Sequence, residues 1–254
     1  MYKKFYIFLV IMLVASLVTS IIYIIINYKE DKEQNEVFEE LENIITECQE
    51  VQNEKQEKKQ EESINLQELY KLNNDFVGWL KIENTNISYP VMQTENDRKD
   101  YYLRKNFYKQ YSQLGTPYIA EYCNIKTSDY VIIYGDHIKN NQIFGELEKY
   151  KKKEFYNNHR VINFNTIYEN AEYEIIAVFK TVAYTGFEYY KFVNSSSKQE
   201  FDTFIKKCKE LSFYETEKTA EYGDKLITLS TCEFSNKNGR LVVIAKKIKA
   251  GLEE

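Results

Sequence analysis

An uncharged stretch of 22 residues, from Phe5 to Ile26, constrains this chain more than any other feature. As a helix it would be about 33 Å long, which is enough to cross a hydrocarbon core of roughly 30 Å. A cleaved signal peptide is the competing interpretation, but the stretch exceeds the usual apolar core of about 7–15 residues and no A-x-A cleavage site follows. Two lysines precede it and a net negative segment follows, so the positive-inside rule places the N-terminus in the cytoplasm. We therefore expect residues 1–28 to be a cytoplasmic flank and single-pass anchor in the cell membrane, with everything after Tyr28 extracellular.

The acidity of the chain is concentrated just after this stretch. Residues 29–62 contain 13 acidic and 5 basic residues, and they lack Pro and Gly, a composition that favours helix. Apolar residues recur there at heptad-like spacing over barely two heptads, which is too short to predict a coiled coil. These residues are Val37, Leu41, Ile44, Cys48 and Val51. We interpret residues 29–63 as an acidic helical stalk or linker that either lies on the following domain or acts as a spacer.

Charge and cysteine usage exclude several function classes. The formal net charge of -5 argues against a nucleic-acid partner, which normally requires a basic surface. The cysteines form no CxxC motif and no Cys/His cluster, so neither a disulfide scaffold nor a structural zinc site is expected. The chain contains four of them, Cys48, Cys123, Cys208 and Cys232. Imidazole chemistry must use His137 or His159, the two histidines, and His159 lies where a structural role is the simpler interpretation. We expect no metal and no organic cofactor.

Residues 64–254 are interpreted as one domain that begins with a short amphipathic helix over residues 64–75. Beyond it, seven β-branched and aromatic runs separated by polar loops indicate a mainly β domain, a barrel or a sandwich. The runs cover residues 86–92, 116–121, 129–134, 160–165, 171–182, 225–231 and 240–248. Two helical patterns interrupt them, near residues 142–158 and 197–211.

A cysteine and an arginine occupy adjoining strand ends in the stretch TLSTCEFSNKNGRLVVIAKK, residues 228–247. The first predicted strand ends at Cys232, a polar loop follows, and the next strand begins with Arg240, one of four arginines among 34 basic residues. A guanidinium beside a thiol favours the thiolate and donates hydrogen bonds to an oxyanion. Taken alone, such a pair is weak evidence, and a structural cysteine would be the default interpretation.

The residues around this pair resemble the signature of the sortases, cysteine transpeptidases of Gram-positive bacteria. The resemblance extends over most of residues 70–248 with the motifs in family order, and the VGWL…YPV opening points to class B. It rests on NNDFVGWLKIENTNISYPVMQ (73–93), DYYL (100–103), IYGDHIKNNQIFGELEKY (133–150), TLSTC (228–232) and RLVVIAKKI (240–248). The resemblance implies a closed, roughly eight-stranded β-barrel with added helices, preceded by the membrane helix and the stalk.

The resemblance also implies an activity and its residues. Class B sortases cleave an NPxT-type sorting signal after Thr, hold the secreted protein as an acyl-thioester, and transfer it to a cell-wall peptidoglycan amine. Carried to this chain, Cys232 is the nucleophile and Arg240 supports the substrate or the oxyanion. Ser230 and Glu233 flank the cysteine at positions that line the sorting-signal groove, and Leu103 forms part of its apolar wall. The implied partners are secreted proteins that bear the signal and a cell-wall precursor.

The chain departs from the family at the catalytic histidine. Sortases carry it directly after the glycine, whereas YGDH places Asp136 there and His137 one residue later. Adjacent side chains of an extended chain point to opposite faces, although Gly135 and the ending strand permit a twist that returns His137 to Cys232. Three interpretations stay open. His137 acts as base and acid, Asp136 takes part of that role, or the chain is a catalytically impaired, sortase-like binding module. An extracellular cysteine endopeptidase is a further alternative.

Overall fold

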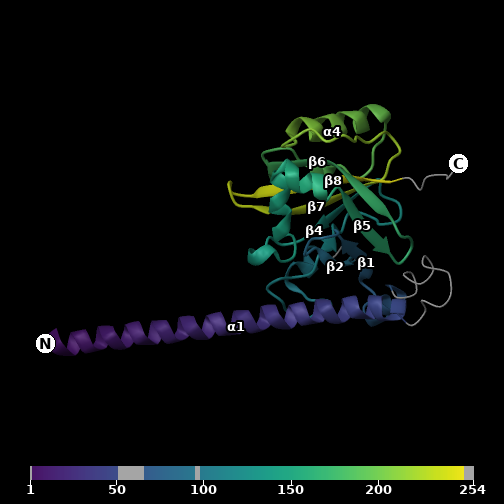
Figure 1. Ribbon diagram of the computed structural model, residues 1–254. Helices are drawn as coiled ribbons and strands as arrows, with labels where there is room; N and C mark the ends of the chain where they lie inside the picture. The colour runs from purple at the N-terminus through teal and green to yellow at the C-terminus, as the bar shows by residue number, and fades with distance from the viewer. Residues whose placement is uncertain (1, 51–65, 95–97, 249–254) are drawn as a thin grey trace.

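Eight strands close into a single barrel in the computed structural model, which describes residues 2–50, 66–94 and 98–248 (Figure 1). Around the barrel the strand order is β1-β2-β3-β4-β7-β8-β6-β5. The strands are β1 (Phe76–Lys81), β2 (Ser88–Met92), β3 (Tyr118–Ile119), β4 (Tyr130–Tyr134), β5 (Val161–Thr166), β6 (Glu172–Val182), β7 (Leu226–Glu233) and β8 (Gly239–Lys247). The mainly β fold and the closed barrel of eight strands are therefore confirmed.

The pairing is mixed, and it brings the end of β7 beside two other strands. β7 lies between β4, with which it pairs in parallel, and β8, with which it forms an antiparallel hairpin. β2 and β3 form the second parallel pair, and the other neighbours are antiparallel. Inward-facing side chains of β4, β6, β7 and β8 are almost completely buried and form the main core. This ladder fixes where the residues at the end of β7 lie.

One strand lies outside the seven runs that the sequence predicts. β1 contains Gly78, whose missing side chain weakens a strand pattern. The same glycine is needed where it stands, because a Cβ there would lie 2.5 Å from the main-chain oxygen of Asn165 in β5. Gly78 thus permits the close approach of β1 and β5 that closes the barrel, and the same residue weakens the strand pattern of β1 in the sequence.

The helices fall close to the predicted patterns. The pattern near residues 142–158 is divided into the 3-10 helix η3 (Gly145–Lys151) and the short helix α3 (Lys153–Asn158), and α4 spans Lys198–Leu211. A short helix covers residues 66–72. The remaining 3-10 turns are η1 (Tyr101–Arg104), η2 (Lys139–Asn141) and η4 (Tyr189–Lys191). α4 lies on the side of the barrel away from the N-terminal helix (Figure 1).

The N-terminal helix α1 runs without interruption from Tyr2 to Glu50 and passes beside β1 and β2 (Figure 1). It is, among the described residues, the one helix long and apolar enough to cross a membrane, and its apolar window is fully exposed. Farther along, Phe38 and Leu41 are buried against the barrel, and the ring of Phe38 packs edge-on against Tyr89 at 5.1 Å. The stalk thus lies on the domain over the part that is described. The side chain of Cys48, and Val51, fall outside the described residues.

Candidate active site

The β7–β8 hairpin places Cys232 and Arg240 directly opposite one another. They are cross-strand partners in the last part of the ladder, followed by the pair Glu233 and Gly239. Gly239 is required there, because a Cβ would lie 2.2 Å from the main-chain oxygen of Glu233. Side chains of directly opposite residues in an antiparallel pair lie on the same face of the sheet. The hairpin therefore holds a half-buried thiol and a guanidinium side by side.

Both side chains line a cavity of about 260 Å³. Its walls come from η1, β3, β4, the ends of β7 and β8, and the loop that follows β6. Six tyrosines form much of this lining, Tyr118, Tyr122, Tyr134, Tyr184, Tyr189 and Tyr190. Tyr184, Tyr189 and Tyr190 form a cluster in the sequence just after residue 182, a pattern that fits a peptide groove or surface packing equally well. Tyr118, Tyr122 and Tyr134 have no such signal in a chain with 23 tyrosines. An aromatic, partly polar cavity beside a thiol suits a peptide ligand.

Two of the three expected substrate-contacting residues lie in this cavity. Leu103 in η1 and Ser230 in β7 both line it. Ser230 is buried, and its Oγ lies 2.6 Å from the Oη of Tyr189. Burial raises the pKa of Tyr189 to about 12, so this phenol stays protonated at neutral pH and keeps its hydrogen to donate. The pair forms a polar patch in the cavity wall next to the cysteine.

The side chain of Glu233 instead belongs to an ion pair outside that cavity. Its Oε1 accepts a hydrogen bond from Lys151 Nζ at 2.8 Å, and its Oε2 accepts from the Oγ of Ser235 at 2.6 Å. Burial by itself raises the pKa of a carboxyl, but these bonds lower the pKa of Glu233 from its usual 4.5 to about 2. Glu233 joins η3 to the hairpin, and its contact with substrate stays a prediction.

Asp136 lines the cavity with Cys232 and Arg240. Its Oδ2 accepts a hydrogen bond from Nη1 of Arg104 at 2.8 Å. The same guanidinium nitrogen donates to the main-chain oxygens of Gln113 and Leu103 at 2.9 Å and 3.1 Å. The ion pair between Arg104 and Asp136 thus links η1, which contains Leu103, to the end of β4. Sequence reasoning did not single out Arg104, because 32 residues separate it from its partner.

His137 lies against the other side of the hairpin. Its Nδ1 is 3.0 Å from the main-chain oxygen of Cys232, and its ring packs edge-on against Phe234 with centroids 4.9 Å apart. Among the described residues, Asp136 lines the cavity, whereas His137 does not. The alternation expected for adjacent residues is therefore observed. With its proton on Nδ1, the imidazole donates to the Cys232 carbonyl and keeps Nε2 as a proton acceptor.

Two other cysteines lie in environments that suppress the thiolate. Burial raises the pKa of Cys123 to about 11 and also raises that of Cys208, which points into the core from α4. Thiolates are the nucleophilic form of cysteine. The half-buried Cys232 is therefore the best candidate nucleophile among the cysteines whose side chains are described.

The second histidine and a second cavity lie elsewhere in the fold. The ring of His159 stacks on the ring of Phe155 with centroids 4.1 Å apart, and its Nδ1 is 2.8 Å from the main-chain oxygen of Phe155.

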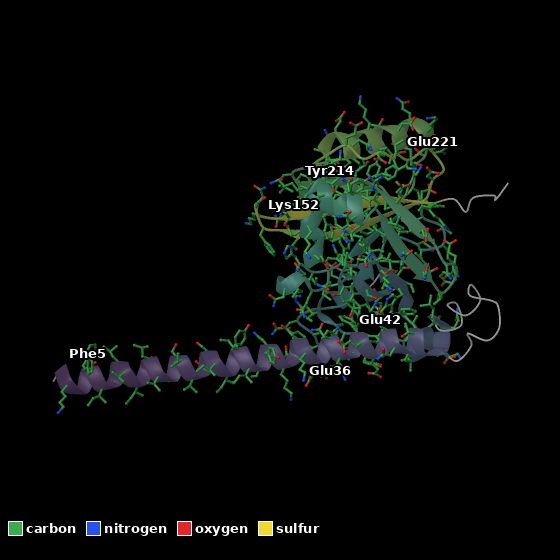
Figure 2. The ribbon with its side chains drawn as sticks, viewed as in Figure 1. Phe5, Glu36, Glu42, Lys152, Tyr214 and Glu221 are labelled. Carbon is green, nitrogen blue, oxygen red and sulfur yellow. The ribbon has the colours of Figure 1, made fainter. Side chains whose placement is uncertain are left out.

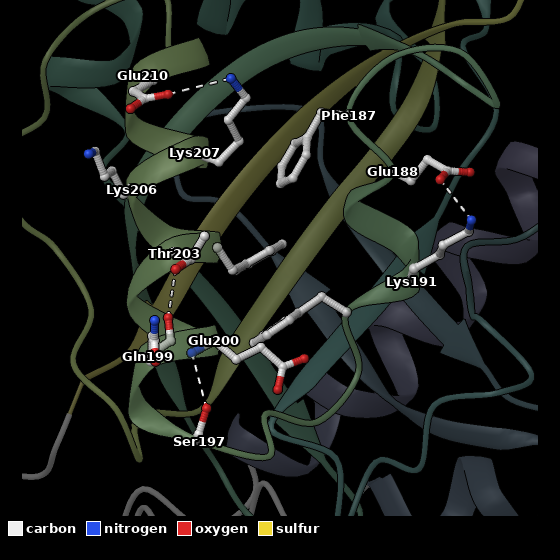
Figure 3. A pocket seen from close by; sticks show the side chains of 12 residues that line it. Phe187, Glu188, Lys191, Ser197, Gln199, Glu200, Thr203, Lys206, Lys207 and Glu210 are labelled. Atoms are coloured by element: carbon white, nitrogen blue, oxygen red, sulfur yellow. Dashed lines mark hydrogen bonds and ion pairs between the residues drawn. The ribbon is translucent and has the colours of Figure 1, made fainter.

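A larger cavity of about 740 Å³ lies between α4 and the η4 segment (Figure 3). Ion pairs such as Lys191–Glu188 and Lys207–Glu210 line it, and the described residues of its lining include neither a cysteine nor a histidine. The described residues contain no cluster of three or more His, Cys, Asp or Glu suited to a metal ion.

Comparisons with known proteins identify a consistent set of relatives. The family described as "Sortase domain" matches residues 80–248. Sortase B of Staphylococcus aureus is 29% identical over 250 residues, which cover 97% of this chain and 98% of that protein. Sortase B of Listeria monocytogenes is 34% identical over 189 residues, 72% of this chain and 74% of the relative. A Staphylococcus aureus sortase B–substrate complex superimposes with a TM-score of 0.76 at 27% identity, covering 88% of this chain and 100% of that one.

Proposed function

Because this chain belongs to the sortase family and is a class B sortase, we propose that it is a membrane-anchored cysteine transpeptidase with Cys232 as its nucleophile. The observation that carries this proposal is the direct pairing of Cys232 with Arg240 at the wall of a tyrosine-lined cavity of about 260 Å³. A neighbouring guanidinium favours the thiolate. The same group can donate hydrogen bonds to an oxyanion that develops beside it.

The proposed reaction has two stages. The Cys232 thiolate attacks the threonine carbonyl of an NPxT-type sorting signal, and Arg240 stabilises the negative charge on the carbonyl oxygen. The tetrahedral intermediate collapses to an acyl-thioester as the peptide bond breaks, and the departing amine takes up a proton. An amine of a cell-wall peptidoglycan precursor then attacks the thioester, loses a proton and releases the thiol.

We assign the proton transfers to His137, as the imidazole hydrogen-bonded to Cys232 itself. A hydrogen bond from Nδ1 to the Cys232 carbonyl fixes the tautomer, and Nε2 is then the atom that takes and returns the proton. The backbone at the end of β4 must bring that atom within reach of the substrate amine, directly or through one water.

The sorting signal is proposed to bind along the cavity that contains Leu103 and Ser230. Leu103 supplies apolar surface, and the hydroxyls of Ser230 and Tyr189 supply hydrogen-bonding groups for a peptide backbone. Glu233 is proposed to act on the signal from the hairpin side, while its carboxylate holds Lys151. The substrate-bound form of the Staphylococcus aureus relative supports a peptide ligand for this class.

The proposed placement follows from the N-terminal helix. Residues 1–28 anchor the chain in the cell membrane with the N-terminus in the cytoplasm, residues 29–63 form the stalk, and residues 64–254 form the extracellular catalytic domain. The exposed apolar window of α1 supports the anchor, and the packing of Phe38 and Leu41 supports a stalk that holds the domain close to it.

A catalytically impaired, sortase-like binding module is the second candidate, and Asp136 favours it. The residue that shares the cavity wall with Cys232 is a carboxylate already engaged by Arg104, where the family carries an imidazole. Loss of a general acid–base typically costs about 10²–10⁴ in rate. Such a module would bind the signal peptide without forming an acyl-enzyme.

The test uses the full chain in detergent micelles with an NPxTx peptide, with and without triglycine as the amine. We expect an acyl-enzyme mass on Cys232, a product joined to triglycine, and loss of both in Cys232→Ala. Cys123→Ala, which removes a buried thiol, is the matched control and should keep both. Cleavage that persists in Cys232→Ala would overturn the nucleophile. Hydrolysis without any gain from triglycine would indicate an endopeptidase instead, and peptide binding without an acyl-enzyme would indicate the binding module.

A further inference from the structure

The anchor helix and the catalytic hairpin point to the same side of the molecule. In Figure 1 the turn between β7 and β8, on the part of the barrel away from α1, points in the same direction as the apolar half of α1 and projects farther that way than the rest of the barrel. The contacts of the barrel with α1 begin at the end of the apolar stretch. Asn27, the residue that follows Ile26, accepts a hydrogen bond from the side chain of Gln113 at 2.9 Å. The barrel therefore starts where the anchor ends.

The barrel is held firmly in this orientation. α1 is one unbroken helix through residues 2–50, so the apolar part and the docked part cannot turn independently. Gln34, Phe38 and Leu41 are all buried against the barrel. The hydroxyl of Ser88 in β2 donates a hydrogen bond to the carboxylate of Glu42 in α1 at 2.7 Å. A bilayer around the apolar part of α1 consequently faces one fixed side of the barrel.

The side that faces the bilayer carries an exposed aromatic residue and several lysines. Phe234, the first residue after β7, is 73% exposed even though its ring edge contacts His137. Lys237 follows in the same turn, and Lys180 donates to Ser235 Oγ at 3.2 Å. Lys152 projects on this side as well (Figure 2). All three lysines are exposed, so their charges are accessible from outside. We call Phe234, Lys237, Lys180 and Lys152 the hairpin-turn surface.

We propose that the hairpin-turn surface rests on the lipid bilayer, with Phe234 among the headgroups and the lysines against acidic lipids. This inference rests on the proposed membrane anchor. An exposed Phe ring is apolar and is stabilised when it is buried at the boundary between the headgroups and the acyl chains. Lysines beside an anionic lipid surface are attracted to it, and the attraction falls off within a Debye length. We assign a lipid bilayer as the partner of the hairpin-turn surface because the membrane around the apolar part of α1 would lie on this side of the barrel.

The contact would bring the reacting groups to the membrane surface. Phe234 is two residues from Cys232, and its ring lies against the imidazole that the proposed mechanism uses. A substrate or an acceptor that is itself held in the membrane would then meet the thiol close to the headgroups. Peptides free in solution would lack this advantage of local concentration.

The test places a tryptophan in the turn of the full chain, reconstituted into nanodiscs with lipids brominated at defined depths. Phe234→Trp reports on the turn. Tyr222→Trp is the matched control, because Tyr222 is also an exposed aromatic residue but its neighbour Glu221 lies at the far end of the barrel (Figure 2). Tyr23→Trp reports on the anchor. The buried Trp79 is present in all three variants and provides a common background.

We expect bromine atoms near the headgroups to quench the indole of the Phe234→Trp variant and to shift its emission to shorter wavelength. The indole of Tyr222→Trp should be unchanged, and that of Tyr23→Trp should be quenched by bromine in the upper part of the acyl chains, because Tyr23 lies three residues before the outer end of the apolar stretch. Quenching in Tyr23→Trp without quenching in Phe234→Trp would overturn the bilayer contact and leave the anchor standing. Absence of quenching in Tyr23→Trp would overturn the anchor and the contact together.

The lysines are tested in the same Phe234→Trp background. Exchanging Lys152 and Lys237 for Glu should reduce the quenching of the introduced indole in discs of phosphatidylglycerol but not in discs of phosphatidylcholine. Equal quenching before and after the exchange in both lipids would overturn the part assigned to the lysines.

Discussion

Cys232 and Arg240 are direct cross-strand partners at the end of the β7–β8 hairpin, although eight positions separate them in the chain. The main-chain oxygen of the same cysteine also lies within hydrogen-bonding distance of His137 Nδ1, at 3.0 Å. The hairpin thus gathers the thiol, the guanidinium and an imidazole around one residue. The arrangement leads to separate expectations for each of these groups.

Replacing Arg240 by Lys should lower the rate of acyl-enzyme formation by about 10²–10³, the usual cost of removing an oxyanion donor. Lysine keeps the positive charge beside the thiolate but not the planar set of donors. Single-turnover mass spectrometry of the Cys232 adduct measures this rate. Arg160→Lys is the matched control, because Arg160 pairs with Glu217 at the surface. An unchanged rate in Arg240→Lys would show that charge alone suffices.

Replacing His137 by Ala should lower turnover by about 10²–10⁴, the usual contribution of a general acid–base. His159→Ala, which removes the imidazole stacked on Phe155, should leave turnover unchanged. The complementary variant is Asp136→His, which places an imidazole directly in the cavity. If turnover rises strongly in Asp136→His while His137→Ala is without effect, His137 is not the acid and the impaired interpretation of the natural chain holds.

The Glu233–Lys151 ion pair should make stability depend on pH in the acid range. The pKa of Glu233 is lowered from 4.5 to about 2 in the folded protein, so the folded state binds this proton less readily than the unfolded state. The resulting stabilisation is fully present above about pH 4.5 and is lost as the pH falls toward 2. Glu233→Gln should therefore lower the free energy of unfolding at pH 7 by on the order of 2 kcal/mol.

Denaturant titrations of the full chain in detergent micelles at a series of pH values measure this dependence. Glu217→Gln, which removes a 70% exposed partner of Arg160, is the control and should cost less than about 1 kcal/mol. The stability difference between Glu233→Gln and the natural chain should shrink between pH 4.5 and pH 2. A difference that stays constant over this range would contradict the lowered pKa.

Replacing Leu41 by Ala should loosen the helix from the barrel. Leu41 is completely buried, and a buried Leu→Ala change usually costs about 2–5 kcal/mol. Thermal unfolding followed by near-ultraviolet circular dichroism measures the loss, and Glu39→Ala on the exposed side of the same turn should change it little. Equal stability of the two variants would show that the stalk is only a tether.

Much of the fold is visible in the sequence because its signals are local. Strand periodicity, the helical face of α4 and the uncharged stretch at the N-terminus each depend on neighbours within a few residues. β1 is not predicted from the sequence because Gly78 interrupts its strand pattern. The glycine is explained by the close approach of β5, which only the structure shows. The candidate site is visible in part, since Cys232 and Arg240 flank one turn and the hairpin pairs them directly.

The order of the amino acids is enough to predict the membrane-length helix, the β character of the domain, the cysteine–arginine pair and the departure at Asp136. Other relationships required the folded chain: Asp136 lines the cavity and binds Arg104, His137 lies against the hairpin turn, and the stalk packs on the barrel. These are contacts between segments far apart in the chain. Local patterns predict on which face of a strand a side chain lies, but only the closed barrel determines which residues that side chain contacts.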